Sequence, residues 1–394
     1  MQEIEIFYQL NKNRVQKPSS KTIGMVSSDI LRSVTNFHQN LPGYRQTPLA
    51  QLKRLAKSSG ISALWVKNEA SRFDLKAFKV LGASYAIGKL LAEKLQLDVD
   101  NFTFKQIIAH AQKFQDFTFV TATDGNHGRA VAWTARKLGC KAVIYMPKGS
   151  SKFRLEAILN LGVEASIIDG NYDDAVRLAA KQSNEKGWIL IQDTSWPGYE
   201  EIPIYIMQGY TTLLIETFQQ LKGEWPSHIF VQAGVGSLAA ALQAFLCYRR
   251  DKPRPFFIIV EPTKADCFFK SMAINDGKPH TIHGDLDTVM AGLACGEPSL
   301  TAWEILKDNA DAFIACPDQV AFRGMRVLGN PIEGDERVIS GESGAVTTGL
   351  VYEILRNVKF IDLKEKLGLK EDSKVLVIST EGDTDPDYYR KVVW

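Results

Sequence analysis

The chain has 394 residues, of which 45% are hydrophobic and 23% are charged, the balance of an ordinary globular protein. Its 47 basic and 45 acidic residues leave a net charge of +2, so we expect neither nucleic acid nor an anionic membrane surface as a partner. The sequence lacks an apolar run of about 20 residues and a signal-peptide pattern, and its five cysteines are widely spaced, so we expect a cytoplasmic protein without a membrane span.

Nine short apolar runs, rich in β-branched residues, alternate with helical patterns along the chain. They cover residues 63–69, 117–124, 141–147, 164–170, 188–194, 228–234, 256–262, 312–318 and 374–380. Near-continuous apolar runs are typical of strands that are buried on both faces, as in a parallel sheet flanked by helices. The sequence therefore predicts an α/β fold with open, twisted, mostly parallel sheets.

The segments between these strands divide into helices and loops. Helical spacing predicts helices over residues 126–138, 151–161, 173–186 and 237–250, and the first three are followed by a glycine. Residues 1–42 are polar and irregular, and we expect an arm that lies on the body or reaches a neighbour. The segments 263–311 and 317–341 have weak periodicity, which predicts long loops with short helices that cover a site or form an interface.

A glycine-containing turn after the strand 228–234 is a candidate phosphate site. In open parallel sheets a ligand binds beyond the carboxyl ends of the strands. Backbone N–H groups of such a turn, together with the start of the next helix, can hold an anion. The turn lacks the ending of a P-loop and the third glycine of a dinucleotide fingerprint, so a tight packing turn remains the alternative. The candidate binding residues are Gly234, Val235, Gly236, Ser237 and Leu238.

Lys79 is a candidate for covalent chemistry. It follows Phe78 and opens an apolar helical pattern, where burial and the helix N-terminus are expected to lower the pKa of its amine. Such an amine suits Schiff-base formation. The alternative is an ordinary solvated lysine, and the neighbouring Lys76 is expected to be the solvated one.

Asp124, Asn126 and His127 lie in the turn between a predicted strand and a predicted helix. Asp124 is a candidate base or ammonium ligand, and Asn126 is a candidate hydrogen-bond donor to a phenolate-type oxygen. Helix capping is the alternative for both residues. We expect His127 to pack rather than to catalyse.

Two further strand ends carry polar candidates. Asp193 ends the run 188–194 and is a candidate acid or base, with helix capping as the alternative. Thr380 ends the run 374–380, and the acidic loop 381–385 that follows is expected to be solvated. We predict no metal site, since the histidine pair of the loop 280–283 has no further nitrogen or sulfur ligand nearby in the sequence.

Together these residues resemble the tryptophan-synthase-β-like family of pyridoxal-phosphate enzymes, also called fold type II. The resemblance implies that Lys79, in Ala77-Phe78-Lys79, binds pyridoxal 5′-phosphate covalently beside Phe78. It implies that Asn126 bonds the 3′-oxygen of the cofactor, with Asp124 at a place where most members have serine. The turn 234–238 would then hold the phosphate.

The same resemblance places Thr380 opposite the pyridine nitrogen of the cofactor. A hydroxyl at this place, rather than a carboxylate, is expected to keep that nitrogen unprotonated and to weaken the ring as an electron sink.

Within this family, long stretches resemble the diaminopropionate ammonia-lyases, among them FKVLGASYAI (78–87), TDGNHGRAVAW (123–133), MAGLACGEP (290–298) and VISTEGDTD (377–385). The resemblance covers most of the chain beyond residue 42. It implies a large cofactor-binding domain of residues 1–80 and 200–394, a small α/β domain of residues 81–199, and a homodimer.

The activity implied is the conversion of 2,3-diaminopropionate, as the D- or the L-isomer, and water into pyruvate and two molecules of ammonia. We hypothesise that Lys79 removes the α-proton of the L-isomer and Asp124 that of the D-isomer, while Asp193 positions or protonates the substrate. The alternatives are another β-eliminating lyase of the family, acting on threonine, serine or cysteine, and a phosphate-binding module without catalysis. We expect Cys267 and Cys295, near the mouth of the site, to be unpaired.

Overall fold

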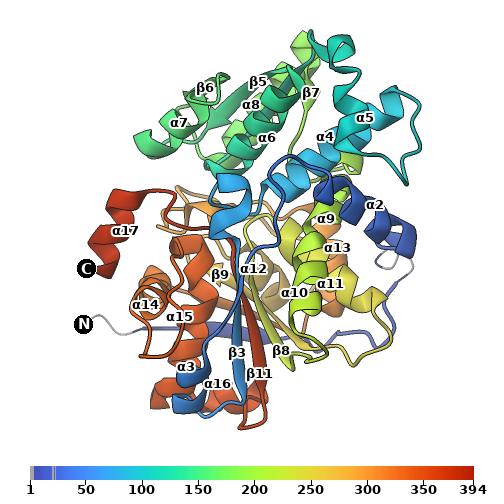
Figure 1. Ribbon diagram of the computed structural model, residues 1–394. Helices are drawn as coiled ribbons and strands as arrows, with labels where there is room; N and C mark the ends of the chain where they lie inside the picture. The colour runs from blue at the N-terminus through green and yellow to red at the C-terminus, as the bar shows by residue number, and fades with distance from the viewer. Residues whose placement is uncertain (1–3, 20–21, 23) are drawn as a thin grey trace.

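The computed structural model describes residues 4–19, 22 and 24–394, and it contains two β-sheets that lie one above the other (Figure 1). The lower sheet has seven strands in the order β1-β10-β9-β8-β11-β3-β2, and the upper sheet has four in the order β6-β5-β4-β7. Both sheets carry helices, so the predicted α/β class is confirmed.

The five central strands of the large sheet are parallel, and the two edge strands are antiparallel to their neighbours. All four strands of the small sheet are parallel. The strands of the large sheet are β1 (Phe7–Leu10), β2 (Leu49–Gln51), β3 (Ala63–Asn68), β8 (His228–Gln232), β9 (Phe256–Pro262), β10 (Ala312–Cys316) and β11 (Lys374–Ser379). Those of the small sheet are β4 (Thr118–Ala122), β5 (Lys141–Met146), β6 (Glu164–Ile167) and β7 (Ile189–Leu190). All nine predicted strands are therefore present, although β7 keeps only two residues of its predicted run.

The helices that accompany the small sheet are α4 (Val80–Lys94), α5 (Phe104–Ile108), α6 (Asn126–Leu138), α7 (Lys152–Leu159) and α8 (Tyr172–Lys186). Those of the large sheet are α2 (Ser28–Gln39), α3 (Lys53–Ser58), α9 (Glu201–Tyr210), α10 (Thr212–Gln220), α11 (Ser237–Tyr248), α12 (Cys267–Ile274), α13 (Leu300–Asn309), α14 (Asp318–Gly329), α15 (Glu342–Arg356), α16 (Ile361–Lys366) and α17 (Pro386–Val393). Short 3-10 turns cover Glu69–Asp74, Ala111–Phe114, Ala291–Leu293 and Val358–Phe360. The four predicted helices are confirmed, but α7 ends at Leu159 with Asn160 as its C-cap, before the expected glycine.

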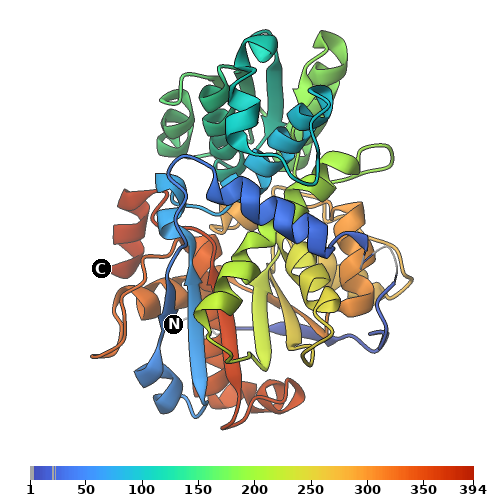
Figure 2. The same cartoon turned by 45° about the vertical axis from the view of Figure 1, so that its right-hand side comes forward.

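The N-terminal segment lies on the body, one of its two predicted placements, but the residues that the structure describes are more regular than expected. β1 pairs with β10 and extends the large sheet, and α2 crosses the molecule between the two sheets (Figure 2). Phe37 and His38 of α2 are fully buried. α2 is polar on average, but Ile30, Val34 and Phe37 recur in it at helical spacing, so the expectation of an irregular segment is wrong there. The rest of the arm, residues 1–3, 20–21 and 23, lies outside the described residues.

The two segments predicted as loops contain more helix than expected. α12 and α13 lie in the first, and α14, with 12 residues, occupies much of the second. α14 packs closely on α15, since a Cβ atom at Gly324 would lie 2.0 Å from the carbonyl oxygen of Ala345. Val320, Ala321, Met325 and Leu328 lie on the buried face of α14 at helical spacing, so the prediction of a loop with short helices is wrong for this segment.

The five cysteines are free and buried, so Cys267 and Cys295 are unpaired as expected. Among the described residues, no helix is long and apolar enough to cross a membrane.

Candidate active site

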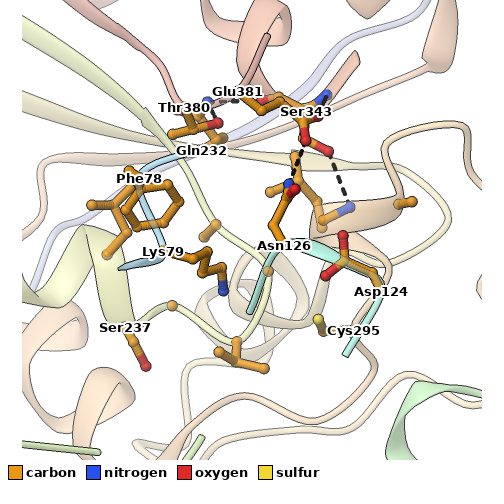
Figure 3. A pocket seen from close by; sticks show the side chains of 18 of the residues that line it. Phe78, Lys79, Asp124, Asn126, Gln232, Ser237, Cys295, Ser343, Thr380 and Glu381 are labelled. Carbon is orange, nitrogen blue, oxygen red and sulfur yellow. Dashed lines mark hydrogen bonds between the residues drawn. The ribbon is translucent and has the colours of Figure 1, made fainter. Parts of the chain in front are cut away.

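A cavity opens where the carboxyl ends of strands from both sheets meet (Figure 3). Every residue predicted to bind the cofactor lines it, and so does Asp124: these residues are Phe78, Lys79, Asp124, Asn126, Gly234, Val235, Gly236, Ser237, Leu238 and Thr380. Asp193 is not part of the cavity wall, but its carboxylate forms an ion pair with the ammonium of Lys79. The fold thus brings all the predicted site residues together.

Lys79 is the N-cap of α4, and its side chain points into the cavity (Figure 3). Its ammonium forms an ion pair with the carboxylate of Asp193. Burial lowers the pKa of Lys79, but the negative charges of Asp193 and Asp124 and the nearby Tyr210 together outweigh burial, so the pKa lies above its ordinary value. The predicted lowering of this pKa is therefore wrong, because the sequence did not show that a carboxylate would pair with the amine.

Lys76 lies apart from the cavity wall. Its ammonium is 2.8 Å from the carboxylate of Asp383, and 40% of its side chain is exposed. Lys76 is therefore the solvated lysine of the pair, as the sequence predicted.

Asp193 is buried beside the ammonium of Lys79. Tyr172 donates a hydrogen bond to it at 3.1 Å, and the amide of Gln192 lies 3.3 Å away. Burial would raise the pKa of Asp193, yet the Lys79 ammonium, with the hydrogen bond from Tyr172, lowers it to about 2. The carboxylate of Asp193 is therefore ionised at physiological pH and pairs with the ammonium of Lys79.

His127 takes the packing place that was predicted for it. Its side chain is buried, and its Nε2 lies 2.7 Å from the carbonyl oxygen of Ile191. Burial lowers the pKa of His127, so the ring is neutral near pH 7.

The turn between β4 and α6 presents two polar side chains to the cavity. Within the described part of the chain, Oδ2 of Asp124 is buried and has no hydrogen-bond partner. Asn126 donates through Nδ2 to Glu381 Oε2 at 2.5 Å. The carboxylate of Asp124 is therefore available to a bound ligand, whereas one N–H of Asn126 is already engaged by the protein.

The turn between β8 and α11 forms the opposite wall of the cavity. Gly236 is the N-cap of α11 and has φ +93°, a left-handed conformation that favours glycine. A Cβ atom there would lie 2.3 Å from the ring of Phe268, so no larger residue fits. The first N–H groups of a helix have no intrahelical acceptor, and Gly236 has no side chain to satisfy them. This wall suits a phosphate.

Thr380 lies in the cavity at the end of β11. Its Oγ1 accepts a hydrogen bond from the amide of Gln232 at 3.0 Å. A hydroxyl that already accepts a bond from the protein keeps its own proton for donation to a ligand.

The sequence did not single out several residues of the cavity wall. They are Tyr172, Gln232, Ser343 and Glu381, whereas Cys295, which was expected near the mouth of the site, also lines the cavity. Glu381 belongs to the acidic loop that was expected to be solvated, but only 1% of its surface is exposed, so that expectation is wrong for this residue. Its direct sequence proximity to Thr380 was the one signal that pointed to the site. Among the described residues, no cluster of histidine, cysteine and carboxylate side chains could hold a metal ion.

These features fit pyridoxal phosphate. A primary amine stands in the cavity, a helix N-terminus with a left-handed glycine faces it, and an amide and a hydroxyl are placed to bond polar atoms of a ring. The three kinds of group match the aldehyde, the phosphate and the ring heteroatoms of that cofactor.

The chain belongs to the family of pyridoxal-phosphate dependent enzymes, whose model matches residues 41–381. It is 47% identical to the diaminopropionate ammonia-lyase of Salmonella typhimurium, over 99% of this chain and 98% of that protein. It is 48% identical to the diaminopropionate ammonia-lyase of Escherichia coli, over 95% of this chain and 94% of that protein.

A solved structure of the Escherichia coli enzyme, in complex with an aminoacrylate-PLP azomethine reaction intermediate, superimposes with a TM-score of 0.91 and 46% identity, covering 100% of this chain and 97% of that one. Threonine deaminase from Solanum lycopersicum, at 21% identity and a TM-score of 0.72 over 98% of this chain and 96% of that one, shares the fold. The fold is that of the type II pyridoxal-phosphate enzymes, and the cofactor of the family is pyridoxal phosphate.

Proposed function

We propose that this protein converts 2,3-diaminopropionate and water into pyruvate and two molecules of ammonia, with pyridoxal phosphate as cofactor. The observation that carries the proposal is the placement of two carboxylates, Asp124 and Asp193, around the one amine in the cavity, Lys79. Relatives of almost the same length are named for this reaction, which supports it.

Different residues of the cavity wall would bind different parts of the cofactor. Lys79 would bind it covalently, the turn 234–238 would hold the phosphate, Asn126 would bond the phenolic oxygen and Thr380 the ring nitrogen. When bound, pyridoxal phosphate withdraws electrons from the α-carbon of an amino acid and so acidifies its α-hydrogen.

Lys79 accepts the α-proton of the L-isomer in this proposal. Because Asp193 stabilises the ammonium, the free amine of Lys79 is a stronger base than an ordinary lysine. The ammonium formed in this way is also an acid, and a departing β-amino group needs a proton to leave. Asp193 positions Lys79 through their ion pair rather than donating a proton itself.

Asp124 accepts the α-proton of the D-isomer. Its unpartnered Oδ2 has a free lone pair at the cavity wall, as a base requires. The same negative charge attracts the second amino group of the substrate, which threonine and serine lack.

The proposal also covers the location, the oligomeric state and the domain motion of the protein. The protein works in the cytoplasm as a homodimer, and residues 81–199 form a small domain that closes on the large one when substrate binds. The small sheet and the helices α4 to α8 supply Asp124 and Asn126 to the cavity, which is the arrangement that such a closure needs.

The test is a comparison of substrates. Purified protein with pyridoxal phosphate is given D- and L-2,3-diaminopropionate, L-serine, L-threonine and L-cysteine at equal concentration, and ketoacid and ammonia are measured. We expect two ammonia molecules per pyruvate and a kcat/KM for diaminopropionate that exceeds the others by at least about a hundredfold, the scale of one well-placed charge contact. A higher kcat/KM for threonine, serine or cysteine would establish the alternative lyase instead.

A further inference from the structure

Glu381 occupies a place that neither the family resemblance nor the proposed reaction explains. It follows Thr380 directly, lines the cavity and is 99% buried (1% exposed). A buried carboxylate without a partner is strongly destabilising, so its surroundings must compensate for the loss of water.

The protein supplies that compensation from three elements. Oε2 of Glu381 accepts from Asn126 Nδ2 at 2.5 Å, and Oε1 accepts from the backbone N–H of Ser343, in the first turn of α15, at 3.1 Å. The positive end of the α15 dipole and the guanidinium of Arg154 add favourable charge. Burial nevertheless raises the pKa of Glu381, so the site is costly to maintain.

The backbone around α15 is shaped for this carboxylate. A Cβ atom at Gly341 would lie 3.0 Å from Oε1 of Glu381, and one at Gly344 would lie 3.0 Å from the backbone nitrogen of Glu381. Residues 380–382 also pair with the loop that carries Lys79: Phe78 N–H donates to the carbonyl of Thr380, and Gly382 N–H donates to that of Lys76. Glu381 is thus held by the Lys79 loop on one side and by α15 on the other.

The chemical consequence concerns Asn126. An ionised carboxylate only accepts hydrogen bonds, whereas the amide of asparagine can present either its oxygen or its nitrogen. Both oxygens of Glu381 accept hydrogen bonds, so Nδ2 of Asn126 faces the carboxyl group (Figure 3). The amide has a second N–H on the same nitrogen, which this contact does not use.

We propose that Glu381 is a positioning residue for the cofactor: by accepting from Asn126 it fixes the amide so that the remaining N–H bonds the phenolic oxygen of pyridoxal phosphate. The inference rests on the proposed place of Asn126 beside that oxygen. It adds a buried carboxyl group, which acts through the amide of Asn126, to the groups that tune the cofactor ring.

The test compares Glu381→Gln with Glu342→Gln. Glu342 is a matched control, because it is also buried in the same cluster, with its Oε2 3.7 Å from Arg154, and its main contact is that guanidinium rather than Asn126. Two properties are measured: the visible absorption spectrum of the holoenzyme across pH, and the dissociation constant of pyridoxal phosphate for protein stripped of its cofactor.

We expect Glu381→Gln to shift the visible band or its pH midpoint and to raise the dissociation constant about tenfold, the scale of one charge-assisted hydrogen bond. Glu342→Gln is expected to leave the band in place. If the spectrum of Glu381→Gln matches that of the unmodified protein, the proposal is overturned.

A double-mutant cycle separates a role through Asn126 from a general structural role. Asn126→Ala alone is expected to weaken cofactor binding about tenfold, and adding Glu381→Gln should change it little further. Additive effects, about a hundredfold in the double variant, would contradict a role through Asn126. An unchanged spectrum and affinity in Asn126→Ala would instead refute the proposed place of Asn126 itself, while the substrate comparison above still tests the reaction.

Asn126→Asp tests the same contact if Glu381→Gln does not fold. It sets two carboxyl groups at hydrogen-bond distance, so they must share a proton, and cofactor affinity should fall below that of Asn126→Ala. Equal affinities of the two Asn126 variants would contradict the proposal.

Discussion

Asp124 and Asp193 are both carboxylates near Lys79, but their surroundings give them different capacities. Asp193 is tied by the Lys79 ammonium and by Tyr172, and its low pKa keeps it charged. Asp124 has an oxygen without a partner in the described structure. At the scale of single residues, the structure therefore separates a carboxylate that holds the lysine from one that is free to meet the substrate.

Asp124→Asn should discriminate between the enantiomers of 2,3-diaminopropionate. The amide keeps the size of the side chain but cannot accept the α-proton, so kcat on the D-isomer should fall by at least about a hundredfold. The L-isomer, served by Lys79, should lose much less. Initial rates of pyruvate formation on each enantiomer measure this, with Asp193→Asn as the control that should slow both. Equal losses on the two isomers in Asp124→Asn would show that Asp124 is not the D-specific base.

At the scale of elements, α2 joins parts that are far apart in the sequence. His38 Nε2 lies 2.9 Å from the carbonyl oxygen of Leu81 in α4, and its Nδ1 lies 2.7 Å from Thr212 Oγ1 in α10. A Cβ atom at Gly88 of α4 would lie 2.6 Å from the ring of Phe37, so the two helices touch closely. α2 thus braces the helix that begins with Lys79.

The buried His38 makes the packing of α2 against α4 and α10 sensitive to acid. Burial lowers its pKa from 6.5 to about 3, so the unfolded chain binds a proton that the folded one does not. Its contribution to stability is complete above pH 6.5 and is lost as the pH falls towards 3. In His38→Gln, the free energy of unfolding should fall at pH 7 and decline less steeply over this pH range. The exposed His110→Gln is the control, and denaturant unfolding at several pH values gives both slopes; identical slopes in the two variants would contradict the assignment.

The start of α11 can be tested with two glycines of similar backbone conformation. Gly236 has φ +93° and would clash with Phe268 on gaining a Cβ, whereas Gly223 has φ +97° and open space around it. Alanine at either place should cost about 1–2 kcal/mol for the left-handed conformation. Only Gly236→Ala should also raise the dissociation constant of pyridoxal phosphate, because the turn 234–238 that would hold the phosphate must move. Equal cofactor affinities in the two variants would remove the turn 234–238 from the phosphate site.

The elements divide into those that the sequence reveals and those that it hides. Central strands such as β8, β9 and β10 are apolar and buried on both faces, which makes them visible in the sequence. β1 and β2 were missed, since edge strands of three or four residues carry little pattern. α2 was missed although Ile30, Val34 and Phe37 recur in it at helical spacing. α14 was missed although Val320, Ala321, Met325 and Leu328 recur on its buried face at helical spacing.

At the scale of the whole molecule, the cavity is assembled from both sheets. Asp124 and Asn126 follow β4 of the small sheet, and Gly236 and Thr380 follow β8 and β11 of the large one. Convergence of strand ends follows from parallel topology, which is why these residues were predictable. The pairing of Lys79 with Asp193 and the burial of Glu381 depend on three-dimensional packing, so the sequence did not indicate either of them.

Cofactor binding should therefore stabilise the molecule as a whole. A ligand present at a hundredfold excess over its dissociation constant raises the free energy of unfolding by about 2.7 kcal/mol. We expect pyridoxal phosphate to raise the thermal midpoint of cofactor-free protein, and to do so less in Lys79→Ala at the same concentration. Differential scanning calorimetry measures both shifts. If Lys79→Ala were stabilised as strongly as the unmodified protein, the amine would contribute nothing to binding.

The most direct test is chemical labelling of the amine. Borohydride reduction of the holoenzyme converts the linkage between pyridoxal phosphate and a lysine into a stable secondary amine, and peptide mapping by mass spectrometry then locates it. The structure predicts the modification on Lys79 and none on Lys76, whose ammonium pairs with Asp383 outside the cavity wall. A label on Lys76 or another lysine, or no label on a protein saturated with cofactor, would contradict this account.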